Sequence, residues 1–186
     1  MKFSESFENL KSAISSDQDL DFLNKSTYEL SQDIKKATYD KKLTTIFGNG
    51  GSAADAQHWA AEMTCTYKSK KRDPFLALAL TTDTSIITAW SNDINFDDVF
   101  RRQIFALSSL NGLSIGLSTS GKSPNVLNAL KEAKKHNAKT VLISGLSRID
   151  KTFIDFHIEF NSTDTPTIQL LTQMLYHSVC EYLETL

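Results

Sequence analysis

Short apolar runs alternate with helical stretches along most of this chain, and this alternation limits its fold more than any other feature. Five runs predict strands, namely Leu43–Phe47, Phe75–Leu80, Leu113–Leu117, Thr140–Ile143 and Phe156–Phe160. Predicted helices start near Ser52, Ser85, Asp97, Ser123 and Pro166. Alternation of this kind builds crossover units, which place successive strands parallel with helices on the faces of the sheet. We therefore predict a three-layer α/β fold with a mainly parallel five-stranded sheet, in which the run 76–80 is covered on both sides.

The N-terminal segment, residues 1–40, lies outside this alternation and is predicted to be helical. Its apolar residues follow two helical stripes, the first at Phe7, Leu10 and Ile14 and the second at Leu23, Tyr28, Leu30 and Ile34. These helices either cover the sheet or pack against another subunit, and the pattern leaves both roles open. A chain of 186 residues is long enough for one domain with a sizeable core. We therefore expect a single domain over 1–186, with a helical segment at 1–40 and a ligand-binding core at 41–186.

Composition excludes several kinds of partner. The net charge of −2 gives no general attraction to nucleic acid or to an anionic membrane. No apolar run is long enough to span a bilayer, and the segment that begins Met1-Lys2-Phe3 has no apolar signal-peptide core. Cys65 and Cys180 are too few for a disulfide framework. We expect a cytoplasmic protein that binds neither nucleic acid nor membrane.

Two loops of small residues follow predicted strands. The first is Gly48-Asn49-Gly50-Gly51-Ser52 and the second is Ser118-Thr119-Ser120-Gly121-Lys122-Ser123. Small residues let a ligand approach the backbone, and helix N-termini present free N–H groups and a positive dipole end. As simple turns, the loops would offer only helix caps, with Ser52 capping a helix from Ala53 and Ser123 capping a helix that begins with Pro124. Two such loops together predict a pocket for a phosphorylated metabolite.

Two nucleotide-binding patterns compete with this prediction and are rejected. The segment 116–123 formally fits the P-loop pattern, but Gly116 lies inside the apolar run instead of opening the loop. The later run ends in Ser144, where an Asp would help to hold magnesium. The first loop has Ala53 where a dinucleotide fingerprint requires Gly.

Polar side chains on two predicted helices could carry chemistry. His58 and Glu62 are four residues apart, so they share one helix face as a metal pair, an acid/base pair or a plain surface ion pair. The last helix carries Gln169, Gln173 and His177 among apolar residues that cover most of its circumference, which predicts a buried helix. Gln169 and His177 are either metal ligands or hydrogen-bonded core residues. Other polar residues are simpler: Asn92-Asp93 is predicted to be a loop or cap within reach of the pocket, and structural roles are expected for His136 and His157.

These residues together resemble the signature of the phosphoheptose isomerase (sedoheptulose-7-phosphate isomerase) family, whose members are sugar isomerase (SIS) domain proteins. The resemblance is carried by segment 48–58 with Glu62, by Asn92 and Asp93, by segment 118–126, and by Gln169 with His177. It runs from about residue 40 to the C-terminus, and the N-terminal helices are similar in pattern. Thr66 and Thr167 stand where relatives often carry Arg.

The resemblance implies an SIS-type fold and a homotetramer with active sites at subunit interfaces. It implies an isomerase that interconverts D-sedoheptulose 7-phosphate and D-glycero-D-manno-heptose 7-phosphate, the entry to nucleotide-activated heptose. One zinc per subunit would be bound by His58, Glu62, Gln169 and His177, with Glu62 as the base and His177 as its acid partner. The implied substrate contacts are Asn49, Gly50, Gly51, Ser52, Glu62, Asn92, Asp93, Ser118, Thr119, Ser120, Ser123 and Gln169.

Two alternatives to the isomerase stay open. The first is a non-catalytic tetrameric SIS module, similar to a relative that binds the bacterial replication initiator. Retention of both Glu62 and His177 argues against it. The second is a sugar-phosphate sensor, and no separate DNA-binding segment supports that role.

Overall fold

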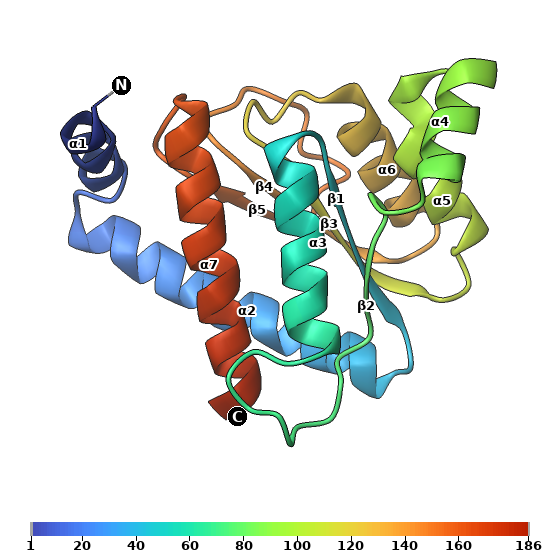
Figure 1. The fold of residues 1–186 in the computed structure, drawn as a ribbon, viewed down its shortest axis with the longest axis horizontal. Helices are drawn as coiled ribbons and strands as arrows, with labels where there is room; N and C mark the ends of the chain where they lie inside the picture. Colours follow the sequence, from blue (N-terminus) through green and yellow to red (C-terminus); the bar gives the residue numbers. More distant parts are fainter. Residues whose placement is uncertain (1, 186) are drawn as a thin grey trace.

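A computed structural model describes residues 2–185, and it confirms the predicted three-layer α/β architecture (Figure 1). The sheet has the strand order β2-β1-β3-β4-β5, and every neighbouring pair is parallel. The strands are β1 (Leu43–Gly48), β2 (Ala77–Ala79), β3 (Asn111–Ser118), β4 (Lys139–Ser144) and β5 (Phe156–Glu159). Residues 1 and 186, the ends of the predicted domain, lie outside the described range. Gly116 lies inside β3, as the rejection of a P-loop requires.

Helices cover both faces of the sheet and enclose two apolar cores. They are α1 (Phe3–Ala13), α2 (Asp17–Tyr39), α3 (Gly51–Thr64), α4 (Thr84–Asp93), the 3₁₀ turn η1 (Phe96–Asp98), α5 (Val99–Ala106), α6 (Pro124–Lys135) and α7 (Thr165–Thr185). One core joins α2, α3 and α7 to residues such as Ile46 and Ile115 on one face of the sheet. The other core joins α5 and α6 to Phe47 and Leu142 on the opposite face. Successive strand residues therefore point to opposite cores, as the pleat requires. Within residues 2–185, none of these helices is both long and apolar enough to cross a membrane.

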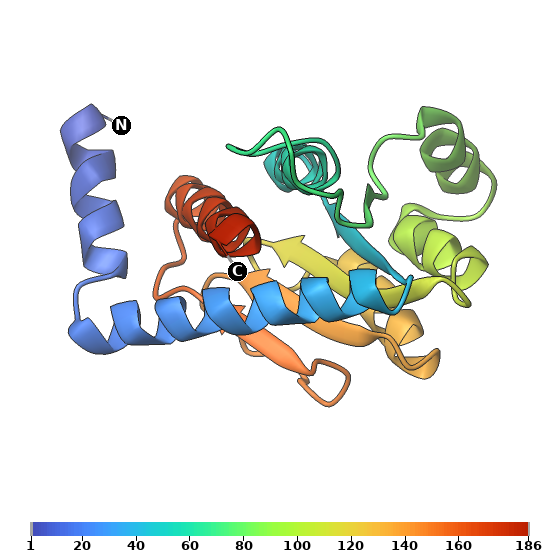
Figure 2. The same cartoon turned by 90° about the horizontal axis from the view of Figure 1, so that it is seen from below.

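The predicted N-terminal helices are confirmed, and they have different surroundings. The helix α2 starts at a capping box of Ser16 and Asp19 and buries Leu30 and Ile34 against the sheet and α7. It therefore covers the core (Figure 2). The helix α1 projects to one side in the same view and buries only Ala13 among its described residues. Most of its apolar surface is left without a partner in this chain.

Two expectations about burial are wrong. The run 75–80 contributes only a three-residue strand, β2, because it lies at the edge of the sheet, and Leu78 is 37% exposed rather than covered on both sides. The last helix is not buried nearly all round, since Leu170 and Met174 are exposed. The helix α7 packs against α1, α2, α3 and one face of the sheet, and these neighbours still leave part of its circumference uncovered. The apolar residues left outside are candidates for contact with another chain.

The two loops leave neighbouring strands at the point where the fold changes direction. Gly48 at the end of β1 pairs in register with Leu117, next to the end of β3. The helix that follows β1, α3, packs on one face of the sheet, whereas α6, which follows β3, packs on the other. Such a switch point opens a crevice at the carboxyl edge of a parallel sheet, where ligands of these folds bind. The topology therefore brings both predicted loops together at the carboxyl edge of the sheet, beside this switch point.

Candidate active site

A reciprocal pair of amide hydrogen bonds joins the first loop to the start of the helix that follows the second loop. The Nδ2 group of Asn49 donates to Oδ1 of Asn125 at 2.8 Å, and Nδ2 of Asn125 donates to Oδ1 of Asn49 at 2.8 Å. Asn125 is buried in the first turn of α6. Each amide satisfies the other, so the pair fixes the spacing between the loops.

The second loop is held by its own hydroxyl groups. The Oγ atoms of Ser118 and Ser123 lie 3.0 Å apart, and Gly121 turns the chain with a φ of 67°. Ser123 is the N-cap residue of α6 and Pro124 is its first residue, as predicted, but the Ser123 side chain makes no capping bond. The exposed Ser120 and the half-buried Thr119 complete the rim of the loop. The Asn125 side chain accepts from the Val126 N–H group within the first turn of α6, whereas the Ser123 hydroxyl leaves the end that faces the loop without a cap, which suits an anion.

The first loop begins α3 in a way that differs from the prediction. The N-cap residue is Gly50, with a φ of 55°, and no side chain caps the helix. Ser52 is the second helical residue, is buried and does not act as the cap. A residue with positive φ ends the turn most easily when it is Gly, so the helix starts two residues earlier than expected. The first N–H groups of α3 also lack a side-chain cap.

The helices α3 and α7 run side by side in the same direction and form one wall of the site (Figure 1). At their N-terminal ends, the Gln169 amide lies so close to Gly51 that a Cβ atom there would collide with it. A hollow of about 440 Å³ opens beside this contact, and its lining includes Gly51, Asp55, Gln169 and Gln173. Burial raises the pKa of Asp55, an effect that His58 opposes. The hollow lies between the first loop and the next turns of both helices.

Farther along the same two helices, three predicted residues converge. Nε2 of His58 lies 3.0 Å from Oε1 of Glu62, and the rings of His58 and His177 have centroids 5.3 Å apart. Ligand atoms of His58, Glu62 and His177 all lie within 4.8 Å of one another. His58 and Glu62 are therefore part of a cluster contributed by two helices rather than a plain surface ion pair.

A buried tyrosine orients this cluster. The Tyr176 hydroxyl lies 2.8 Å from Nδ1 of His58, and its ring stacks on Trp59 with centroids 5.6 Å apart. Burial raises the pKa of Tyr176 to about 12, so the hydroxyl stays protonated at neutral pH. Both nitrogens of His58 consequently have partners, and the ring has one defined orientation.

His177 lies between three aromatic neighbours, which are His58, Tyr67 and Tyr176. Its ring contacts Tyr176 edge to face at 4.7 Å between centroids, and Tyr67 stacks on it at 5.7 Å. Burial lowers the pKa of His177, His58 acts in the same direction, and Glu62 opposes both. The imidazole is therefore neutral at neutral pH and can donate or accept a proton.

The remaining predicted residues lie elsewhere. Asn92 and Asp93 are in the last turn of α4, not in a loop, where Nδ2 of Asn92 donates to Asp93 at 2.8 Å. Figure 1 shows α4 on the opposite side of the sheet from α7. His136 ends α6 and contacts Glu132, and His157 in β5 lies 2.9 Å from the Ser144 hydroxyl. Both histidines have the structural surroundings that the sequence predicts.

A larger groove, of about 730 Å³, lies at the amino edge of the sheet. Lys36, Lys42, Asn111 and Lys139 are among its lining residues, and neither of the two loops contributes to it. Ligands of parallel sheets bind outside the carboxyl ends of the strands. The converging side chains of His58, Glu62 and His177 lie on helices that start at the carboxyl edge of the sheet. We therefore place the site beside the smaller hollow, at the carboxyl edge.

Several residues of the site were not singled out from the sequence. Asn125 has no signal of its own within the segment 118–126, and Tyr176 has none because tyrosine on a buried helix face is ordinary core. Asp55 and Tyr67 were likewise unassigned. Their roles depend on which helix faces meet, and spacing along one helix does not report that.

Comparisons with known proteins agree with this geometry. A model of the SIS domain family matches residues 3–145. Over 140 residues, the chain is 46% identical to the phosphoheptose isomerase of Aliarcobacter butzleri, which covers 75% of this chain and 74% of that protein. The solved phosphoheptose isomerase GmhA from Neisseria gonorrhoeae has a TM-score of 0.79 at 31% identity, covering 99% of this chain and 95% of that chain. A phosphoheptose isomerase from Francisella tularensis has a TM-score of 0.84 at 25% identity, with the same coverages.

The parallel sheet, the two loops at its switch point and the family match over residues 3–145 define the class: this chain belongs to the SIS domain family. The sequence identity to the named relatives, over about three quarters of this chain, assigns it more narrowly within that family. Within that family, the chain belongs to the phosphoheptose isomerases.

Proposed function

We propose that the protein is an aldose–ketose isomerase that interconverts D-sedoheptulose 7-phosphate and D-glycero-D-manno-heptose 7-phosphate. The observation that carries this proposal is the convergence of Glu62 and His177, from two helices, near two loops suited to a phosphate. The names of its relatives support the same activity. The aldose phosphate formed would be the first intermediate of nucleotide-activated heptose synthesis.

The reaction moves a carbonyl group between neighbouring carbons. A base removes one proton from C1 of the ketose, and the electrons of that C–H bond form an enediol(ate) between C1 and C2. A proton then returns to C2, while the hydroxyl proton of C1 is lost and the C2 oxygen gains one. No atom is gained or lost overall. The site must therefore supply a base, an acid and donors for the charge that develops on oxygen.

Glu62 and His177 fit these requirements. We assign the carbon-to-carbon proton transfer to the Glu62 carboxylate, whose partly exposed side chain projects from α3. We assign proton exchange with the sugar oxygens to the neutral His177 imidazole. Tyr67 and Tyr176 restrict the His177 ring, which keeps its nitrogens in a defined position.

We propose that the phosphate is held by the second loop. Its hydroxyl groups and the uncapped N-terminus of α6 provide donors without a fixed positive side chain. The full set of proposed substrate contacts is Asn49, Gly50, Gly51, Ser52, Glu62, Asn92, Asp93, Ser118, Thr119, Ser120, Ser123 and Gln169. Gly51 and His58 are seven residues apart on α3, about 10 Å at the helical rise. An extended seven-carbon ester can bridge that separation from the loop region to the cluster.

Asn92 and Asp93 need a separate explanation. They are exposed on α4 and lie apart from the cluster of the same chain. We propose that they reach a substrate only in an assembly, where a subunit interface completes the site. This is the geometry that the family resemblance implies.

The donor set suits zinc. Imidazole nitrogens of His58 and His177 with a carboxylate oxygen of Glu62 match the three protein ligands of a catalytic zinc site. Tyr176 supplies the outer hydrogen bond that such a ligand histidine usually has. The fourth proposed ligand is Gln169, which lies beside Gly51 and about 12 Å of helical rise from His177. The two side chains would have to extend toward each other along α7 to share one ion. When bound, zinc would polarise the sugar oxygens.

We propose a homotetramer. Phe3 is 88% exposed and Phe7 is 49% exposed on α1, and Leu170 and Met174 are exposed on α7. Apolar side chains in such number on two helices are typical of a surface covered by another chain. We also propose that residues 1–186 act as one domain with a helical segment at 1–40, and that it works in the cytoplasm.

An isomerase assay tests the function. The purified protein, loaded with zinc, is incubated with sedoheptulose 7-phosphate, and formation of the aldose is followed by NMR. Turnover that is lost with a chelator and restored by zinc would support both the activity and the metal. Absence of aldose with zinc and with other divalent metals would reject the isomerase, and a stable complex with a protein partner would then favour the non-catalytic module.

A further inference from the structure

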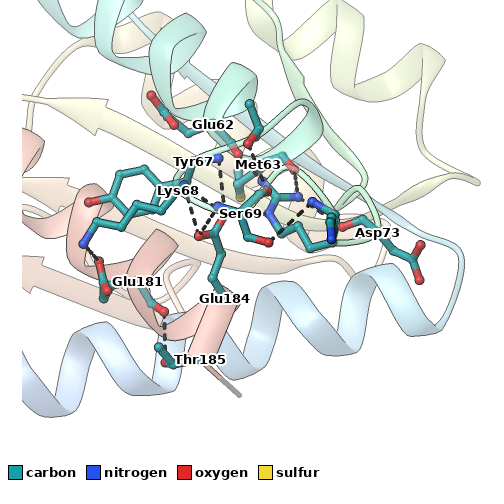
Figure 3. Close-up of polar contacts among 12 residues, drawn as sticks. Glu62, Met63, Tyr67, Lys68, Ser69, Asp73, Glu181, Glu184 and Thr185 are labelled. Atoms are coloured by element: carbon teal, nitrogen blue, oxygen red, sulfur yellow. Dashed lines mark hydrogen bonds and ion pairs between the residues drawn. The ribbon is translucent and has the colours of Figure 1, made fainter.

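The Glu184 carboxylate, near the end of α7, binds the loop that follows α3 (Figure 3). Glu184 accepts hydrogen bonds from the backbone N–H groups of Tyr67, Lys68 and Ser69, at 3.3, 3.1 and 2.9 Å. The Nε group of Arg72 donates to the same carboxylate at 3.0 Å. The Glu184 side chain is only 7% exposed. Four donors from segment 65–73 therefore converge on one buried carboxylate.

Arg72 connects the same carboxylate to the last turn of α3. Its Nη1 group donates to the carbonyl oxygen of Met63 at 2.8 Å, and its Nη2 group donates to the carbonyl oxygen of Glu62. Carbonyl groups in the last turn of a helix lack intrahelical partners, so the guanidinium satisfies them and complements the negative end of the dipole. The turn of α3 that bears Glu62 is thus tied to α7 through Arg72 and Glu184.

The position of Glu184 is unfavourable for helix stability alone. A negative charge near the C-terminus of α7 opposes the helix dipole, and burial adds a desolvation cost. The three N–H groups and Arg72 offset both effects and hold the pKa of Glu184 below its usual range. The neighbouring pair of Lys68 and Glu181 lacks these properties, since both of its side chains are exposed. The buried contact, not the exposed pair, fixes the loop.

The hydrogen bonds from the loop to Glu184 determine where Tyr67 lies. The Tyr67 backbone is held by Glu184, and its ring stacks on His177 with an interplanar angle of 28°. The same set of contacts therefore reaches both groups that would transfer protons, His177 through Tyr67 and Glu62 through Arg72.

We propose that Glu184 is a positioning residue for the isomerisation, which acts through Arg72 and Tyr67 to align Glu62 and His177. This proposal rests on the roles proposed above for those two residues. It assigns a catalytic consequence to segment 65–73, which contacts neither of the proposed phosphate loops. Loosening the segment should therefore lower kcat and leave KM for the sugar phosphate almost unchanged.

The test compares Glu184→Gln with Glu181→Gln, a matched change one turn earlier on the same helix and facing the same loop. Amide hydrogen exchange of the peptide that spans 65–73 measures how firmly Glu184 holds the loop. Steady-state kinetics with zinc and sedoheptulose 7-phosphate measure the alignment of Glu62 and His177. We expect Glu184→Gln to speed exchange at residues 67–69 about tenfold. We expect it to lower kcat roughly 10- to 100-fold, with KM within about twofold of the unmodified protein. Glu181→Gln should change neither quantity.

Tyr67 provides a test that does not depend on the folding of Glu184→Gln. Tyr67→Ala should reproduce the loss of kcat, whereas Tyr67→Phe, which keeps the stacked ring, should retain most of the rate. The proposal is overturned if Glu184→Gln frees the amides but leaves kcat intact, or if Tyr67→Ala turns over normally. An unmodified protein without turnover would instead show that the isomerase assignment itself had failed.

Discussion

The Tyr176 hydroxyl and Nδ1 of His58 lie 2.8 Å apart, and this contact leaves the other nitrogen of His58 facing Glu62 at 3.0 Å. Tyr176 is fully buried and stacked on Trp59, so the hydroxyl has little freedom. A ligand histidine is usually held in this way by an outer partner. The relationship explains how an exposed turn of α3 can present a preorganised imidazole.

Removal of that hydroxyl should weaken metal binding more than it weakens folding. In Tyr176→Phe, the ring still stacks on Trp59, but His58 loses its orienting partner. We expect zinc affinity to fall about 10- to 100-fold, measured by competition with a chromogenic chelator. Tyr182→Phe on the same helix is the matched control, because its ring contacts Tyr28 instead of the cluster. Equal zinc affinity in Tyr176→Phe and the unmodified protein would remove Tyr176 from the site.

The amide pair between the loops should control substrate affinity. Asn125→Ala leaves the Asn49 amide without its partner, so we expect KM for the sugar phosphate to rise several-fold and stability to fall by about 1–3 kcal/mol. Kinetics and urea unfolding measure the two effects. Asn128→Ala is the control, since Asn128 lies on the same helix but bonds to Asp97 at 3.1 Å, away from both loops. A KM that rises equally in both variants would argue against a specific role for the pair.

The apolar face of α1 should be needed for assembly. We expect Phe7→Asp to convert a tetramer into smaller species, because a charge on that face cannot be buried in an interface without a partner. Light scattering coupled to size-exclusion chromatography gives the mass. Phe105→Asp is the control, because each phenylalanine is 49% exposed but Phe105 lies on α5. This control variant should keep the mass of the unmodified protein. An unmodified protein that is monomeric would refute the tetramer.

Glu184 should make stability depend on pH at the acid end. Its pKa is lowered in the folded protein below the ordinary value of 4.5 by hydrogen bonds from the segment 67–69 and by Arg72. A lowered carboxyl pKa adds stability that is present above the unfolded value and is lost as the pH falls through the folded value. Arg72 is the cation in contact with Glu184, and Lys68, which pairs with Glu181, also interacts electrostatically with Glu184.

We therefore expect the protein to be more stable than Glu184→Gln by roughly 1–3 kcal/mol at pH 7. The difference should shrink steadily below pH 4.5. Urea unfolding of both proteins across this range measures it. A difference that stays constant down to the acid limit would mean that the charge of Glu184 contributes nothing.

Much of the fold was predictable because its signals are local. Each buried strand of the sheet is an apolar run between turn residues, and Leu113–Leu117 and Thr140–Ile143 fall inside β3 and β4. The edge position of β2 was not predictable, since an apolar run looks the same at an edge and in the centre. The start of α3 at Gly51 was missed because Ser52 resembles an ordinary cap, whereas the positive φ of Gly50 depends on the preceding turn.

The site residues likewise divide into those with a local sequence signal and those whose roles depend on tertiary packing. The spacing of His58 and Glu62 on one helix is visible in the sequence, and their meeting with His177 agrees with the family resemblance. The contacts of Tyr176 depend on how α3 and α7 pack, and those of Glu184 depend on how the loop after α3 folds against α7, which no spacing in one segment reveals. The residues proposed to act in the reaction were therefore easier to predict than the residues that contact and orient them.

The most direct measurement of the central claim is the isomerisation of sedoheptulose 7-phosphate in D2O by the unmodified protein and by Glu62→Gln. If Glu62 transfers the proton, the unmodified protein forms an aldose with deuterium at C2, while Glu62→Gln remains folded and loses turnover by about 1000-fold or more. Glu62→Gln that forms the deuterated aldose at a rate near that of the unmodified protein would contradict the account.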